Sequence, residues 1–133
     1  STIIAIMLTV IISFVGVSSA GIGTKANPMQ DSRIDVVKSQ QIFKDYTVTY
    51  GECLDNKCTD PEWTIFSSSD KKKVVEFNGN VVYNNMNSSL KIQFVYNDSD
   101  DYWALSYMAL NGTAMDSNCA ALLLNYLCSD YFN

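Results

Sequence analysis

The residues with the clearest chemistry in this sequence are four cysteines at two spacings, Cys53-x4-Cys58 and Cys119-x8-Cys128. Neither spacing matches the usual zinc-binding motifs, and the chain contains no histidine, so we expect no metal site and no cofactor. Four cysteines in a short chain with an apolar N-terminal segment are typical of an exported protein with disulfide bonds. The sequence therefore predicts an oxidising location rather than the cytosol.

The pairing of these cysteines is not fixed by the sequence, because four cysteines allow three pairings. A bridge between Cys53 and Cys58 would enclose a turn-prone Asp-Asn pair and would leave Cys119 and Cys128 for each other. If the residues from Cys119 to Cys128 were all helical, the Cα atoms of these two cysteines would lie about 13 Å apart, beyond the limit of about 7 Å for a disulfide bond. Either the helix ends near Asn125 or the pairs cross. We prefer the local pairing, and the crossed pairing remains open.

Catalytic groups are not evident in the sequence. It has no histidine, no Gly-rich phosphate loop and no Ser or Cys beside a plausible base, so we expect no enzyme activity. The net charge of −5 would repel phosphate backbones, and nucleic-acid binding is therefore not expected. The acidic residues are interpreted as loop residues that face solvent: Asp55, Asp60, Glu62 and Asp98 to Asp101.

Three asparagines fit the N-glycosylation sequon, namely Asn87, Asn97 and Asn111. All three fall in predicted loops, where a glycan could be attached. Because the chain is rich in Asn and Ser, chance occurrence of the sequon is the preferred interpretation.

From Glu52 onward the pattern predicts a β-rich unit that positions these residues. Short runs rich in β-branched and aromatic residues predict strands over residues 63–66, 73–77, 80–83, 90–96 and 102–110. Turn residues separate them at Asn78-Gly79, Asn84 to Ser89 and Asn97 to Asp101. The simplest assembly of these pieces is an antiparallel sheet.

The last segment, residues 114–127, is predicted to form a short helix after a turn at Asn111-Gly112-Thr113. Asp116 or Ser117 could cap this helix. We expect the helix to close against the sheet, with four residues at helical spacing: Cys119, Leu122, Leu123 and Tyr126.

The N-terminal segment is apolar and carries no charge from Ser1 to Thr24. As a helix, 24 residues would rise about 36 Å, enough to cross a hydrocarbon core of about 30 Å. Gly21 and Gly23 loosen its end, and Pro28 should break or kink the helix. Beyond this point apolar residues recur every seven positions, at Met29, Val36, Phe43 and Tyr50. This repeat predicts an amphipathic helix over residues 29–51, which Gly51 would end.

Three interpretations of the N-terminal segment compete. It could be a secretory signal peptide that ends at the small residues Val17-Ser18-Ser19-Ala20, a plain membrane anchor, or a retained stem. The segment lacks a basic n-region, which favours a retained stem. The predicted organisation is a hydrophobic stem helix over residues 1–28, an amphipathic helix over residues 29–51 and a disulfide-bonded β-rich head over residues 52–133.

Together these features resemble the type IV pilin superfamily, and most closely its type IVb branch. The resemblance lies in the apolar stretch Ser1 to Gly21, in Phe77-Asn-Gly79-Asn-Val81, and in the strand, turn and Cys-containing helix start from Tyr102 to Leu122. It implies an α+β fold, in which a long N-terminal hydrophobic helix packs on a small antiparallel sheet with a short C-terminal helix.

The same resemblance implies a structural subunit of a pilus-like extracellular filament, with a role in adhesion, aggregation, motility or DNA uptake. Its partners would be other copies or pilins, the cytoplasmic membrane before assembly, and the pilus assembly machinery. Stems of this family usually carry Glu at the fifth position, whereas this chain has Ala5, which fits either a minor or tip subunit or a main subunit whose helices pack in a different register. The expected assembly residues are Ser1, Ile4, Ala5, Leu8, Ile11, Ile12, Phe14 and Val15. The alternative is a secreted disulfide-bonded binding module with residues 1–20 as a signal peptide.

Overall fold

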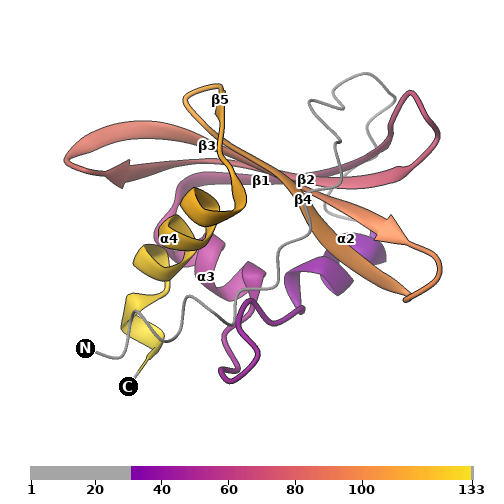
Figure 1. Ribbon diagram of the computed structural model, residues 1–133, viewed down its shortest axis with the longest axis horizontal. Helices are drawn as coiled ribbons and strands as arrows, with labels where there is room; N and C mark the ends of the chain where they lie inside the picture. Colours follow the sequence, from indigo (N-terminus) through magenta and orange to yellow (C-terminus); the bar gives the residue numbers. More distant parts are fainter. Residues whose placement is uncertain (1–30, 133) are drawn as a thin grey trace.

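The computed structural model describes residues 31–132, which form a five-stranded antiparallel sheet with three short α-helices. The strands follow one another in the sheet in chain order, β1-β2-β3-β4-β5. All three helices lie on the same side of this sheet (Figure 1). The elements are α2 (Ser32–Lys38), α3 (Tyr50–Lys57), β1 (Thr59–Ser67), β2 (Lys73–Tyr83), β3 (Met86–Asn97), β4 (Tyr102–Leu110), β5 (Thr113–Ala114), α4 (Ser117–Leu127) and the 3-10 helix η2 (Ser129–Tyr131).

The sheet confirms the predicted antiparallel arrangement but corrects two of the predicted turns. Asn78-Gly79 is not a turn, because β2 is continuous and pairs with β3 along its whole length. A Cβ at Gly79 would come within 2.8 Å of the Phe77 ring and 3.1 Å of the Cys58 Cβ, so glycine allows close packing here. The turn predicted over Asn84 to Ser89 is only the pair Asn84-Asn85, because β3 begins at Met86. The φ values of this pair, 53° and 62°, suit a two-residue hairpin.

The core lies between the sheet and the helices. Alternate strand residues point to this side, and an aromatic group at its centre joins β1, β2, β3 and α3. Its members are Trp63, Phe77, Phe94 and Tyr50. The ring centroids of Tyr50 and Phe94 are 4.8 Å apart, and the Trp63 ring lies 5.0 Å from Phe77 and 6.2 Å from Phe94. Helix α4 covers the other end of this side with Ala120, Leu123, Leu124 and Leu127.

The predicted long N-terminal helix packed on the head is wrong, because the described part of the chain contains no such helix. The helix expected over residues 29–51 is two helices, since α2 ends at Lys38 and α3 begins at Tyr50. The chain between them folds back, and Gln41 forms a β-bridge with Thr49. This arrangement buries five apolar residues that would not share one face of a single helix: Ile34, Val37, Ile42, Phe43 and Val48. None of the helices between residues 31 and 132 has the length and hydrophobicity needed to cross a membrane.

Gly51 does not end a helix, as the sequence predicted, but lies in the first turn of α3. A Cβ at this position would come within 2.7 Å of the Lys38 Cβ. The glycine therefore allows α2 and α3 to approach each other closely.

At Trp103, the outer edge of β4 is covered by the side chain of Gln40. The Gln40 side-chain amide donates to the Trp103 carbonyl at 2.8 Å and accepts from the Trp103 backbone N–H at 3.1 Å. Gln40 thus makes both hydrogen bonds that a neighbouring strand would make at this residue. Exposed strand edges invite pairing with other chains, so this contact protects the sheet from edge-to-edge association.

Tyr50 carries a buried hydroxyl that has no hydrogen-bond partner within residues 31–132. Burial raises the pKa of this hydroxyl, so it stays neutral. Because an unsatisfied buried polar group is costly, we expect Tyr50→Phe to raise the free energy of unfolding by about 1 kcal/mol. Urea denaturation of both proteins measures the difference. A loss of stability in Tyr50→Phe would mean that the hydroxyl is paired in solution.

Candidate functional site

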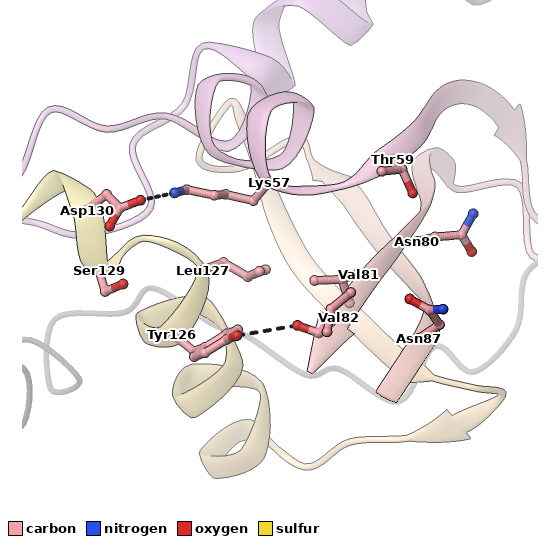
Figure 2. Close-up of a pocket in the computed structure, with 10 residues that line it drawn as sticks. All are labelled: Lys57, Thr59, Asn80, Val81, Val82, Asn87, Tyr126, Leu127, Ser129 and Asp130. Atoms are coloured by element: carbon pink, nitrogen blue, oxygen red, sulfur yellow. Dashed lines mark hydrogen bonds and ion pairs between the residues drawn. The ribbon is translucent and has the colours of Figure 1, made fainter. Parts of the chain in front are cut away.

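A cleft of about 350 Å³ lies between the C-terminal end of α4 and the end of β2. Figure 2 shows its walls, which come from α3, β1, β2, β3, α4 and η2. Neutral polar side chains line much of it, and two buried apolar residues form its inner wall. The lining residues are Lys57, Thr59, Asn80, Val81, Val82, Asn87, Tyr126, Leu127, Ser129 and Asp130.

The cleft lies along a free edge of the sheet. The last pair between β1 and β2 is Thr59 with Asn80, whereas β2 continues to Tyr83. Within the described residues, the end of β2 that leads into the β2–β3 turn therefore pairs only with β3. Since Tyr83 and Met86 flank a two-residue hairpin and exchange backbone hydrogen bonds, the N–H and C=O of Val82 point to the free side.

The Val82 carbonyl has only a weak partner in this cleft. The Tyr126 hydroxyl donates to it at 3.4 Å, at the long limit of a hydrogen bond (Figure 2). The Tyr126 ring packs edge-on against Tyr83, with centroids 5.2 Å apart. Helix α4 is thereby held beside the strand edge without filling the position of a neighbouring strand.

Exposed apolar side chains gather around this cleft. Five large hydrophobic residues are exposed in the described part of the chain, and two of them, Val82 and Tyr126, line this cleft. Leu122 and Tyr126 are one turn apart on α4, while Val82 and Met86 flank the β2–β3 turn. They are 46–62% exposed, and the fifth residue, Val36, lies on α2. Exposed apolar surface with a polar rim is typical of an interaction site. The Val82 side chain points to the side of the sheet opposite α4, because it alternates with the core residue Val81, so the four residues do not form one continuous surface. We call these four residues the α4–hairpin patch.

The charged residues of the cleft neutralise each other. The Lys57 ammonium donates to the Asp130 carboxylate across the end of the cleft (Figure 2). This hydrogen bond raises the pKa of Lys57, so the ion pair persists at neutral pH. The cleft therefore presents hydroxyl and amide groups rather than net charge to a ligand.

The cysteines are placed differently from the preferred local pairing. Cys53 in α3 and Cys128 at the end of α4 have their Sγ atoms 2.9 Å apart, and both are buried. Cys58 caps the C-terminus of α3, which places it about 7.5 Å along the helix axis from Cys53. Helix α4 is continuous from Ser117 to Leu127, so Cys119 is about 13 Å from Cys128. The structure thus brings together a crossed pair that the sequence left open.

The remaining two thiols have different surroundings. Burial raises the pKa of the Cys58 thiol to about 12, which keeps it protonated and unreactive at neutral pH. Cys119 is exposed, and its contact with the Asp116 carboxylate raises the pKa of its thiol. Neither thiol is therefore poised to act as a nucleophile.

Helix α4 confirms the predicted C-terminal helix and its cap, because the Asp116 carboxylate accepts a hydrogen bond from the Cys119 N–H at 2.8 Å. The face it packs on the sheet is different from the one expected. Of the four residues at the predicted spacing, only Leu123 is buried, while Cys119, Leu122 and Tyr126 are exposed. The hydrophobic residues of this helix surround it almost completely, so spacing alone could not separate the core face from the patch.

The other predicted site residues are scattered. The loop placement predicted for the sequons is correct only for Asn111, because Asn87 lies in β3, where it lines the cleft, and Asn97 is the last residue of that strand. The side-chain oxygens of Asn97 and Asn111 accept the backbone N–H groups of Ser99 and Ser89. The expected assembly residues and helix-break residues lie outside the described residues: Ser1, Ile4, Ala5, Leu8, Ile11, Ile12, Phe14, Val15, Gly21, Gly23 and Pro28. Within residues 31–132, no three Cys, Asp or Glu side chains are grouped so that they could hold a metal ion.

Sequence reasoning missed the cleft because its residues come from six elements. The one available signal was the apolar pair Leu122 and Tyr126 in a helix that already had a sufficient buried face. Comparison of the chain with models of protein families, with curated proteins and with solved structures finds no match. The role as a pilus subunit therefore stays a prediction from the sequence.

Proposed function

We propose that this chain is an exported, non-catalytic binding module that docks an extended apolar segment of a partner protein in the cleft beside β2. The observation that carries the proposal is a free strand edge that borders a cleft lined by two exposed large hydrophobic residues, Val82 and Tyr126. Apolar side chains would anchor the ligand, and the backbone of Val82 would give it direction.

The form of the ligand follows from the shape of the edge. An extended segment can add a strand to an exposed sheet edge, with backbone hydrogen bonds for affinity and side-chain contacts for specificity. The free edge of β2 is only about three residues long, from Val81 to Tyr83, so the added strand must be short. The start of β1 is less suitable, because Pro61 cannot donate and Asp60 has a φ of 52°.

The size of the patch favours a weak or transient complex. Four half-exposed side chains offer on the order of 300 Å², whereas a stable protein–protein interface needs about 800 Å² on each partner. A short segment bound in a cleft fits this area better than a second copy of the chain does.

A phage-displayed library of random peptides provides a defined probe for the full chain. Selected peptides should carry apolar or aromatic residues, and their binding should fall about tenfold or more in Val82→Ser/Tyr126→Ser, because each side chain loses about 1 kcal/mol of burial. Isothermal titration calorimetry with the synthetic peptide measures the effect. The matched control is Val36→Ser, which removes an equally exposed apolar side chain outside the cleft.

The edge pairing is tested separately with the same peptide. Methylation of a central peptide N–H should weaken binding if that group donates to the Val82 carbonyl, since the methyl group removes the donor. The proposal is contradicted if the selected peptides bind Val82→Ser/Tyr126→Ser as tightly as the unsubstituted chain, or if no peptide is selected. Equal loss of binding in Val36→Ser would also contradict it.

A further inference from the structure

The side of the sheet without helices carries a second cleft, of about 490 Å³, which crosses β1, β2, β3 and β4. Four of its lining residues pair with one another in a row across these strands, namely Glu62, Asn78, Lys91 and Ala109. Each precedes or follows a core residue along its strand, so their side chains point away from the helices. We call this cleft the helix-free cleft.

A β-bulge brings a second carboxylate to the helix-free cleft. Thr59 and Glu62 are three positions apart, whereas their partners on β2, Asn80 and Asn78, are only two apart, so β1 contains one extra residue. Asp60 lies in this bulge with a φ of 52°, which is uncommon for a residue other than glycine. Asp60 and Glu62 both line the cleft and are exposed. Their carboxylates can therefore accept hydrogen bonds from a ligand.

The charged side chains of the helix-free cleft do not neutralise each other, in contrast to Lys57 and Asp130 in the cleft beside β2. None of the ion pairs within residues 31–132 involves Asp60, Glu62 or Lys91. The ammonium of Lys91 is thus available as a donor beside the two acceptors.

Asn78 is held in one orientation by a network of side chains. The Gln93 amide donates to one Glu76 oxygen at 2.9 Å, and the Asn78 amide donates to the other at 2.6 Å. Because the amide nitrogen of Asn78 faces Glu76, its Oδ1 is directed away and can accept a hydrogen bond. An acceptor that is already positioned lowers the cost of ordering it when a ligand binds.

Among the described residues that line the helix-free cleft, Tyr107 is the one aromatic residue. It lies two positions before Ala109 on β4, and alternate residues of a strand point to the same side. Ala109 has no side-chain atoms beyond Cβ, which leaves space between the Tyr107 ring and Lys91, the partner of Ala109 on β3. The half-exposed ring offers a flat apolar surface with polar groups around it.

The chemistry of this lining disfavours several classes of ligand. Two carboxylates outweigh Lys91, so a phosphate or another polyanion would be repelled. Asn78 and Lys91 are each paired with both neighbouring strands, so the floor of the cleft offers no free edge to an extended peptide. One ring is too little apolar surface to hold a purely apolar ligand. A ligand with many hydroxyl groups and one apolar face fits the lining best.

We propose that the helix-free cleft binds a carbohydrate. The Tyr107 ring lies against the C–H face of one sugar ring. Asp60, Glu62 and Asn78 accept hydrogen bonds from sugar hydroxyls, and Lys91 donates to a hydroxyl or ring oxygen. The volume lies within the range of small-molecule sites, about 300–1,000 Å³. Because each of these hydrogen bonds replaces one with water, we expect a dissociation constant of about 1 mM.

This site is separate from the cleft beside β2. Val82 and Tyr126 line the cleft beside β2 and do not line the helix-free cleft. Peptide binding and carbohydrate binding can therefore be tested independently, and either can fail without the other.

An array of defined neutral and acidic oligosaccharides provides the probe for the full chain. We expect the bound oligosaccharides to share one sugar unit. Titration of the ¹⁵N-labelled chain with such an oligosaccharide, followed by NMR, should shift backbone amides around Asn78, Lys91 and Tyr107. Tyr107→Ala should weaken binding about tenfold, because it removes the surface that contacts the sugar ring. The matched control is Val82→Ser/Tyr126→Ser, which should bind the oligosaccharide as tightly as the unsubstituted chain.

A second variant covers the case in which Tyr107→Ala does not fold. Glu62 is exposed, and Glu62→Gln keeps the shape of its side chain while it removes the charge. Binding should fall about threefold or more, because a neutral amide oxygen accepts a hydrogen bond more weakly than a carboxylate does. The proposal is overturned if no oligosaccharide on the array is bound, if only sulfated ones are bound, or if the shifted amides lie elsewhere. Unchanged binding in Glu62→Gln and in folded Tyr107→Ala would overturn it as well, and so would equal loss in the control.

Discussion

The oxidised chain is expected to contain a disulfide bond between Cys53 and Cys128, and its free energy of unfolding should be about 2–5 kcal/mol higher than that of the reduced chain. The two Sγ atoms are already 2.9 Å apart, in side chains that the fold holds in place from α3 and from the end of α4. Oxidised glutathione accepts the two electrons and the two thiol protons. Urea denaturation with and without reductant measures the stability, and peptide mapping without reduction identifies the bond.

The size of the effect follows from the length of chain that the bond closes. Cys53 and Cys128 are 75 residues apart, and the loss of chain entropy in the unfolded state is worth about 4 kcal/mol for a loop of that size. The bond would also tie α3 to the C-terminus of α4, which form two walls of the cleft.

Two variants make this expectation specific. Cys128→Ser should lose the whole stabilisation, whereas Cys119→Ser should keep it, because Cys119 is exposed and distant along α4. The high pKa of Cys58 keeps its thiol protonated, so exchange into a Cys53–Cys58 bond should be slow at neutral pH. A map dominated by Cys53–Cys58 or Cys119–Cys128 would contradict this assignment.

The sheet could be predicted from the sequence because its signals are local. Alternating β-branched and aromatic residues, and turns such as Asn111-Gly112, depend only on neighbouring residues. Asn78-Gly79 was misinterpreted for the opposite reason. The pair has the composition of a turn, but Gly79 serves a contact with Cys58, which lies 21 positions earlier in the chain.

The helices and the cleft could not be predicted because they depend on contacts between distant parts of the chain. The seven-residue repeat from Met29 to Tyr50 suggested one helix. The apolar residues between α2 and α3, however, reach the core only when the chain folds back. Long-range packing overrides such a weak periodicity. Likewise, the free edge of β2 exists because β1 begins only at Thr59, which no local pattern indicates.

Phe94→Ala is expected to lower the free energy of unfolding by about 3–5 kcal/mol, because it removes a fully buried ring and leaves a cavity. Phe94 lies on β3, the middle strand of the sheet, and contacts two aromatic rings from other elements. Its ring is edge-on to Tyr50 of α3 at 4.8 Å and stacked with Trp63 of β1 at 6.2 Å. Thermal unfolding followed by circular dichroism, together with urea denaturation, measures the loss.

A graded control separates the cavity from the aromatic contacts. Phe94→Leu keeps most of the buried volume and should cost much less than Phe94→Ala, with about 0.5–1.5 kcal/mol of its effect due to the lost aromatic pairs. Because Tyr50 and Trp63 belong to α3 and β1, loss of the Phe94 ring weakens the attachment of α3 to the sheet. A Cys53–Cys128 bond in the oxidised chain would also hold α3, so the reduced Phe94→Ala chain should be the least stable of the four combinations. A cost below about 1 kcal/mol in the reduced chain would show that α3 is held mainly by other contacts.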